Sequence, residues 1–232
     1  MTGAGRLASR FFDAIAGRYD RVYALPAAES RHRMERVVAS LPPPPARLLV
    51  LGVGTGRELP ALLDAGYAPT GLDVSRAMLD RCARRSRPVP LVEGDFWTAP
   101  LPFETGAFEG IVALHGTLAH PPDAAAVARL AAEAARVVGA GGGRFVIEAP
   151  SLAWLDRLPS SFDQDAGDGE RRVLRTGPAT LLYEDRVVGG GIEALLLGEA
   201  EWRTLLAPHW RVRVEPLGDV EWFVVAERAT GG

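Results

Sequence analysis

The sequence predicts an α/β fold in which helices cover a mostly parallel β-sheet. Short apolar runs alternate with amphipathic helical stretches between residues 47 and 148, and this alternation is typical of parallel strands joined by right-handed crossovers. The run at 48–51, Leu-Leu-Val-Leu, is apolar throughout and ends at a glycine. Continuous apolar runs are expected of strands buried on both faces, as the inner strands of a parallel sheet are.

Five strands and three connecting helices follow from this pattern. The helix at 123–138 is the clearest, because its apolar residues recur at i, i+3 and i+4 and the glycine-rich stretch at 139–143 ends it. A second helix is expected to begin after Ser75, whose hydroxyl suits a helix cap, and a third at 57–65. The expected strands are at 47–51, 70–74, 89–92, 110–114 and 144–148.

Two helices at 9–23 and 29–41 predict an N-terminal helical cap over residues 1–41. Four prolines at 42–45 separate this cap from the domain at 46–232. The domain is expected to end in a short helix around Trp202 and a C-terminal antiparallel hairpin, 210–215 with 221–227.

Past Ser151 the alternation of strands and helices stops. A polar stretch at 160–172 precedes two β-rich runs, 179–188 and 192–197, which three glycines join like a hairpin. We therefore expect a β-hairpin insertion after strand five, at about 151–198, that acts as a substrate lid.

The composition excludes several function classes. The 232 residues contain no lysine and no asparagine, which rules out a Schiff-base nucleophile and a phosphate-binding loop of the lysine type. The lone Cys82 excludes an internal disulfide and a cysteine-based zinc cluster. A formal net charge of −3 gives no basic face for nucleic acid.

The sequence also bears on the protein's setting. No signal-peptide core is visible near the N-terminus, and the longest apolar runs are far too short to cross a bilayer. We expect a cytoplasmic protein with no membrane partner, and a homodimer is compatible with the sequence.

A glycine-rich turn, Gly52-Val53-Gly54-Thr55-Gly56, follows the first strand and opens a helix, as a nucleotide-binding turn does. Asp73 ends the next strand 21 residues after Gly52, where an acidic side chain binds a ribose diol. A dinucleotide site would have its third glycine at position 57, but Arg57 stands there. This spacing disfavours a nicotinamide cofactor.

The GxGxG spacing resembles motif I of the class I S-adenosylmethionine (SAM)-dependent methyltransferases. The resemblance covers residues 11–150 most strongly, and the opening 12–20 is similar to a frequent start in the small-molecule branch. Further similar motifs lie at 71–85, 93–96, 108–112 and 135–145.

This resemblance implies a Rossmann-like fold and SAM as the cofactor. It assigns Asp73 to the ribose, Asp95 to the adenine amino group and Phe96 to the face of the adenine ring. Tyr19 either closes over SAM from the cap or is a core aromatic of the stripe that contains Phe12. The candidate cofactor-binding residues are Tyr19, Gly52, Val53, Gly54, Gly56, Asp73, Val74, Asp95, Phe96 and Leu114.

The chain departs from the family's pattern at two positions. Val50 stands where the family usually has an acid that helps to organise the methionine end of SAM, and Glu109 replaces the usual aspartate at the entry to strand four. The ribose and adenine contacts through Asp73 and Asp95 stay available.

Two histidines follow the fourth strand, at the sheet edge where ligands of such folds bind. A base helps methyl transfer when the acceptor must lose a proton, and histidine titrates in the useful range. We take His115 as the first candidate base and His120 as the second. In the competing interpretation His115 only packs beside the cofactor, and His120 shapes the entry to the next helix.

Candidate substrate-binding residues lie on strand five and in the insertion. Glu148 ends strand five and suits a cationic or hydroxylated substrate, or is a solvated strand end. Tyr183 and Asp185 alternate to the same face of the insertion and either reach the substrate or only decorate the sheet. Trp97, Trp154 and Phe162 are candidate walls of an apolar pocket; in the alternative interpretation they only pack against the sheet.

The same composition narrows the methyltransferase classes. Ribose 2′-O-methyltransferases use a catalytic tetrad that contains lysine, and the amino-group DNA methyltransferases and the catechol-type magnesium enzymes each use an asparagine. Because this chain has neither lysine nor asparagine, it does not resemble these branches of the family. We therefore predict metal-independent methyl transfer from SAM to a nitrogen or oxygen of a small-molecule substrate. The alternatives are a SAM- or S-adenosylhomocysteine (SAH)-binding protein without catalysis, and a nicotinamide-dependent oxidoreductase.

Overall fold

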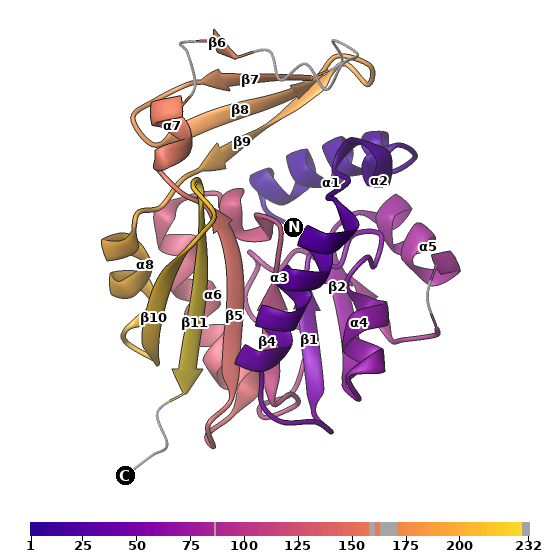
Figure 1. Ribbon diagram of the computed structural model, residues 1–232, viewed down its shortest axis with the longest axis vertical. Helices are drawn as coiled ribbons and strands as arrows, with labels where there is room; N and C mark the ends of the chain where they lie inside the picture. The colour runs from indigo at the N-terminus through magenta and orange to yellow at the C-terminus, as the bar shows by residue number, and fades with distance from the viewer. Residues whose placement is uncertain (86, 158–160, 163–170, 229–232) are drawn as a thin grey trace.

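A seven-stranded sheet forms the centre of the computed structural model, which describes residues 1–85, 87–157, 161–162 and 171–228. The strand order is β10-β11-β5-β4-β1-β2-β3 (Figure 1). The first five strands pair in parallel, whereas β11 runs antiparallel to β5 and to β10. The bounds are β1 Arg47–Leu51, β2 Ala68–Asp73, β3 Leu91–Glu93, β4 Gly110–Ala113, β5 Arg144–Pro150, β10 Trp210–Leu217 and β11 Glu221–Arg228. The Rossmann-like, mostly parallel sheet with a C-terminal antiparallel hairpin is confirmed.

Helices cover both faces of this sheet because the side chains of β1 alternate between two cores. Leu49 and Leu51 pack with α6 and α8 on one face, and Leu48 and Val50 pack with α3, α4 and α5 on the other. The helices are α3 Ala27–Ser40, α4 Leu59–Asp64, α5 Arg76–Arg85, α6 Ala124–Val138 and α8 Glu199–Leu206, and a 3-10 turn, η1, spans Thr117–Ala119. None of the described helices is long and apolar enough to cross a membrane.

The N-terminal segment forms three helices where two were expected. The predicted helix at 9–23 is instead α1, Gly3–Ile15, followed by a short α2, Tyr19–Val22. The first helix begins early because the Thr2 hydroxyl accepts a hydrogen bond from the Gly5 amide at 2.8 Å, a helix cap that the apolar periodicity does not reveal. The break between α1 and α2 contains Gly17, a residue that weakens helices.

The insertion after β5 is larger than the predicted hairpin. It contains α7, Ala153–Arg157, and a second, antiparallel sheet in the order β6-β7-β8-β9. The strands are β6 Ser161–Phe162, β7 Arg171–Arg175, β8 Thr180–Asp185 and β9 Gly190–Leu195.

The predicted hairpin is β8 with β9, and β6 and β7 are additional strands at the described ends of the polar stretch at 160–172. Strand β7 was missed because a strand with one solvated face needs few apolar residues, and Val173 alone of its central residues is fully buried.

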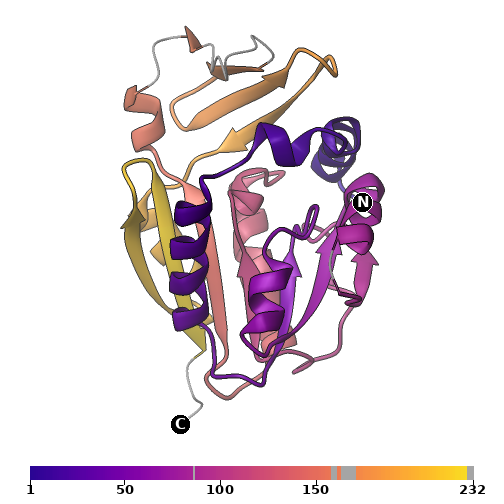
Figure 2. The same ribbon diagram turned by 45° about the vertical axis from the view of Figure 1, so that its right-hand side comes forward.

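The insertion sheet lies beyond the carboxyl ends of the parallel strands, next to α1 (Figure 2). Phe11 and Ile15 of α1 pack with Met78 of α5 and Ile192 of β9. The N-terminal helix, the main domain and the insertion thus share one small apolar cluster, and this cluster fixes the walls of the site.

Two glycines of the turn after β1 allow a test of how closely this turn packs against α5. Gly54 and Gly56 have φ values of +53° and +74°, where an added Cβ is strained. A Cβ at Gly56 would also lie 2.6 Å from Sγ of Cys82, whereas the nearest atom at Gly54 would be 3.9 Å away. We expect Gly54→Ala to lower the free energy of unfolding by about 1–2 kcal/mol and Gly56→Ala by about 2–4 kcal/mol. Urea denaturation of the ligand-free protein measures both, and equal losses would contradict the packing of Gly56 against α5.

Candidate active site

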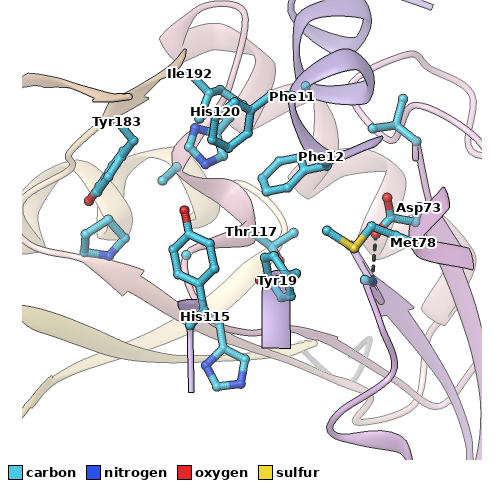
Figure 3. Close-up of a pocket in the computed structure, with 18 of the residues that line it drawn as sticks. Phe11, Phe12, Tyr19, Asp73, Met78, His115, Thr117, His120, Tyr183 and Ile192 are labelled. Atoms are coloured by element: carbon cyan, nitrogen blue, oxygen red, sulfur yellow. Dashed lines mark hydrogen bonds between the residues drawn. The ribbon is translucent and has the colours of Figure 1, made fainter. Parts of the chain in front are cut away.

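A cavity of about 490 Å³ lies at the carboxyl ends of the parallel strands (Figure 3). Three parts of the chain enclose it: α1 contributes Phe12, the main domain contributes Asp73 and His120, and the insertion contributes Tyr183 and Ile192. The cavity therefore sits where an open α/β sheet binds its ligands. The other predicted site residues that line it are Tyr19, Gly52, Gly54, Val74, Asp95, Phe96 and His115.

Asp73 anchors the glycine-rich turn to the end of β2. One carboxylate oxygen accepts a hydrogen bond from the Gly54 amide at 2.8 Å, and the other accepts one from the Ser75 amide at 2.9 Å. Burial raises the pKa of Asp73 to about 6, although these backbone hydrogen bonds oppose the shift. A carboxylate accepts up to four hydrogen bonds, so two positions stay available for the hydroxyls of a ribose.

Asp95 is paired with the N-terminal segment. Its Oδ2 accepts hydrogen bonds from the amide of Thr2 at 2.7 Å and from the hydroxyl of Thr2 at 2.8 Å. The same oxygen accepts a third from the Thr98 hydroxyl at 3.1 Å, while Oδ1 accepts one from the Trp97 amide at 3.0 Å. Oδ1 therefore has the capacity left for an adenine amino group, and Phe96 lies beside it in the cavity wall.

The remaining cofactor candidates surround the turn itself. Val53 and Leu114 line a second, small pocket beneath Gly52, and Tyr19 lines both this pocket and the main cavity. Burial raises the pKa of the Tyr19 hydroxyl, so it is a neutral donor. Gly56 lines neither pocket and packs toward α5, so its place in the candidate set is structural.

His115 lies between two buried carboxylates. Its Nε2 is 2.8 Å from Oε1 of Glu58, and its Nδ1 is 3.7 Å from Oε2 of Glu148. The backbone of His115 has a φ of +54°, and its amide donates to Oε2 of Glu148 at 3.2 Å. A left-handed backbone is strained in a residue with a Cβ. The contacts with Glu58 and Glu148 hold the ring and the backbone of His115 in this conformation.

The two carboxylates around His115 differ in their electrostatics. Burial by itself raises the pKa of Glu58, but the hydrogen bond from His115 and the nearby charges outweigh it, and the pKa lies below its ordinary value. Burial raises the pKa of Glu148 against the opposing charges of His115 and Arg33. Oε1 of Glu148 is buried and has no hydrogen-bond partner among the described residues. Glu148 is thus not a solvated strand end.

His120 lies on the other side of the cavity, beside Phe12 and Ile192 (Figure 3). Its Nδ1 is 2.6 Å from the backbone oxygen of Glu193. A carbonyl oxygen only accepts hydrogen bonds, so Nδ1 carries the proton and Nε2 carries the lone pair of the neutral ring. Burial lowers the pKa of His120 and favours this neutral form.

The insertion residues divide into one that lines the cavity and one that does not. Tyr183 lies in the cavity wall with Trp154, and their rings are 6.4 Å apart. The carboxylate of Asp185 instead accepts hydrogen bonds from the amides of Val187 and Val188 at 3.0 and 3.2 Å. Asp185 therefore holds the β8–β9 turn and is absent from the cavity wall. Trp97 lines the cavity as expected, and the side chain of Phe162 lies outside the described residues.

Several lining residues were missed by sequence reasoning. Arg57 and Glu58 line the small pocket, Thr117 lines the main cavity, and the guanidinium of Arg57 lies 5.2 Å from the centre of the Tyr19 ring. Arg57 and Glu58 are visible in the sequence as charged residues directly after the glycine-rich turn. Thr117 carries no sequence signal, because its place depends on the turn that follows β4.

The residues present fit SAM. The glycine-rich turn leaves room for close approach of a ligand, Asp73 aims a buried carboxylate into the cavity, and Asp95 and Phe96 stand further along the same wall. No group of three or more His, Cys, Asp or Glu side chains is placed to hold a metal ion within the described part of the chain.

Comparisons with known proteins agree with this geometry. Residues 48–142 match the family model described as a methyltransferase domain. A curated relative, the demethylmenaquinone methyltransferase of Corynebacterium kroppenstedtii, is 34% identical over 188 residues, which cover 77% of this chain and 76% of the relative. The chain belongs to the class I SAM-dependent methyltransferases, and it catalyses SAM-dependent methyl transfer. The nicotinamide and non-catalytic alternatives have no support.

Solved structures share the fold at low sequence identity. The CcbJ methyltransferase of Streptomyces caelestis superposes with a TM-score of 0.72 at 19% identity, covering 97% of this chain and 99% of that one. The SAM-bound CalS10, an amino pentose methyltransferase of Micromonospora echinaspora, gives 0.67 at 20% identity, covering 91% and 96%. A SAM-dependent methyltransferase of Clostridium acetobutylicum gives 0.73 at 14% identity, covering 95% and 100%.

The two departures from the family's pattern have different settings. Val50 is buried in the core beneath the glycine-rich turn. Glu109 pairs with Arg47, with Oε1 2.6 Å from Nη2 and Oε2 accepting from the Arg47 amide at 2.7 Å. Both residues of this pair lie at the amino ends of their strands, away from the cavity, so the extra methylene of Glu109 affects only the far edge of the sheet.

The raised pKa of Asp73 predicts how cofactor affinity depends on pH. If Asp73 binds the ribose, as the resemblance to the family implies, the ribose hydroxyls donate to its carboxylate. Binding then favours the ionised form, and protonation opposes binding. The affinity for SAH should therefore be full above the pKa of about 6 and fall by up to roughly tenfold per pH unit below it. Calorimetric titration between about pH 5 and pH 8 measures this. Asp73→Asn should bind more weakly at every pH and lack this component of the pH dependence; a variant with the wild-type profile would contradict the role of Asp73.

Proposed function

We propose that this methyltransferase acts on a small molecule, at an oxygen or nitrogen that loses a proton during the transfer, and that His120 accepts that proton. The observation that carries the proposal is the setting of His120 in the cavity wall. SAM supplies an electrophilic methyl group on a sulfonium. The acceptor atom forms a bond to the methyl carbon as the carbon–sulfur bond breaks, and the acceptor proton moves to Nε2 of His120.

The hydrogen bond of His120 supports its role as the base. Nδ1 donates to the Glu193 oxygen at 2.6 Å, which fixes the tautomer in which Nε2 is the acceptor. Lowering of the pKa by burial keeps the ring neutral near pH 7. His115, the first candidate in the sequence, has Nε2 engaged by Glu58 at 2.8 Å. We therefore reverse the order of the two candidate bases.

The walls of the cavity support a small and largely apolar acceptor. Phe12, Trp154, Tyr183 and Ile192 come from four separate elements and line the cavity around His120. Enclosure by aromatic side chains with a few polar groups is typical of small-molecule sites. Tyr183 belongs to this proposal as a substrate contact, because burial raises its pKa and keeps the hydroxyl a neutral donor. The predicted cytoplasmic location and homodimer stay predictions.

The names of the related proteins point to two acceptor classes for a first assay. The curated relative is named for demethylmenaquinone, and CalS10 is described as an amino pentose methyltransferase. The purified protein is incubated with SAM and a panel that includes a demethylated naphthoquinone and an amino sugar, and SAH is quantified by chromatography. Acceptor-dependent SAH together with a product methylated at nitrogen or oxygen supports the proposal, whereas methylation at a ring carbon of the naphthoquinone would contradict the proposed acceptor atom. Transfer only to protein or nucleic acid would contradict it.

His120→Asn tests the base. The asparagine amide can still donate to the Glu193 oxygen, but the lone pair of Nε2 is lost. We expect kcat to fall by roughly a hundredfold or more with little change in the affinity for SAH. In the wild type, kcat should decrease as the pH falls below the ordinary histidine value, because protonation removes the acceptor, and this acid limb should vanish in the variant.

His115→Asn is the matched comparison for the same assay. It removes the second candidate base from the opposite side of the cavity, and we expect it to retain the acid limb of the pH profile. An acid limb that persists in His120→Asn and vanishes in His115→Asn would overturn the assignment.

A further inference from the structure

We propose that Glu58 binds the ammonium group at the amino-acid end of SAM and that Arg57 faces the carboxylate at the same end. Glu58 would thus replace the acid that the family usually has at the position of Val50. This inference rests on the SAM site described above and concerns one end of it. Nothing in the sequence pattern of the glycine-rich turn assigns a role to either residue.

The pocket beneath the glycine-rich turn has the size and position for such a group. Its volume is about 20 Å³, which is room for one water-sized group such as an ammonium. It shares Gly52, Gly54 and His115 with the main cavity, so the two adjoin at the turn. A ligand whose ribose is held by Asp73 on one side of the turn can extend its other end into this pocket.

The pocket presents both charges that a zwitterion requires. Glu58 has only 8% of its surface exposed, and Arg57 lines the same pocket with its Nε 3.8 Å from Oε1 of Glu58. Glu58 is ionised, because the contacts from His115 and Arg57 hold its pKa below the ordinary value. A carboxylate accepts up to four hydrogen bonds, so its contact with His115 leaves capacity for an ammonium.

The other nearby residues cannot take this role. Val50 lines the pocket from the end of β1 but offers only methyl groups. Glu148 is a buried carboxylate, yet it does not line this pocket; it lines an adjoining cavity of about 410 Å³, which shares Arg57, Glu58 and His115 with the pocket and is also bounded by α3. The amide of His115 donates to Glu148 at 3.2 Å and its ring contacts Glu58, so Glu148 supports the histidine that holds Glu58 in place.

The test compares two ligands that differ only at this end. SAH carries the amino-acid chain, whereas 5′-methylthioadenosine has the same adenosine and sulfur without it. We expect Glu58→Gln to weaken SAH binding by roughly tenfold to a hundredfold and to leave the affinity for 5′-methylthioadenosine unchanged, both measured by calorimetry. The glutamine oxygen can still accept from Nε2 of His115, so the fold is retained. Glu35→Gln, on the exposed face of α3, is the control and should bind both ligands as the wild type does.

A double variant tests whether a carboxylate at the position of Val50 can replace that of Glu58. In Val50→Asp/Glu58→Gln the carboxylate moves to the end of β1, and we expect it to recover part of the lost SAH affinity. Unchanged SAH affinity in Glu58→Gln would overturn the inference. An equal loss for both ligands would also overturn it, because Glu58 would then act through the shape of the turn. A wild-type protein that binds neither ligand would instead contradict the SAM site itself.

Discussion

The buried carboxylate of Asp73 joins the two strand ends on which the site depends. It accepts from the Gly54 amide in the turn after β1 and from the Ser75 amide at the start of α5. Removing a charge from water is unfavourable unless hydrogen bonds replace the lost hydration, and the pKa of about 6 shows that the two amides replace it only in part. In the SAM site proposed for this chain, ribose hydroxyls would supply the remaining partners. The ligand-free carboxylate is destabilised because part of its lost hydration is not replaced, and ligand binding is favoured because it would replace that part.

The two histidines show how one segment separates two roles. Both follow β4, but a 3-10 turn at Thr117–Ala119 lies between them and sends their rings to opposite sides of the cavity (Figure 3). His115 is surrounded by ionic groups, and its ring nitrogens face Glu58 and Glu148. His120 is surrounded by apolar groups and has a single backbone acceptor. A base needs an unengaged lone pair, and a positioning residue needs firm contacts, so each environment suits its own role.

The sequence predicted the fold and SAM as the cofactor, because both predictions depend on local patterns. Apolar runs and a glycine-rich turn specify where strands end, and parallel strands place those ends at one edge. The different surroundings of the two histidines were not predictable, since they depend on Glu58 and on the Glu193 oxygen, which lies 73 residues from His120 in the insertion. Asp185 was misplaced for a similar reason. Alternation gives the face of a strand, but a carboxylate near a hairpin turn is captured by the turn's own amides.

The N-terminal cap is attached to the domain at the cofactor-binding elements themselves. Asp13 of α1 accepts from the Ser75 hydroxyl at 2.6 Å, two residues after Asp73. Thr2 donates to Asp95, and Asp20 of α2 accepts from the Thr55 hydroxyl in the glycine-rich turn at 2.6 Å. A cap that only covered the cavity would not need to contact the glycine-rich turn, Ser75 and Asp95 together. Because it contacts all three, the hydrogen bonds that position the cap also position Asp95, the turn and the end of β2, which line the cavity.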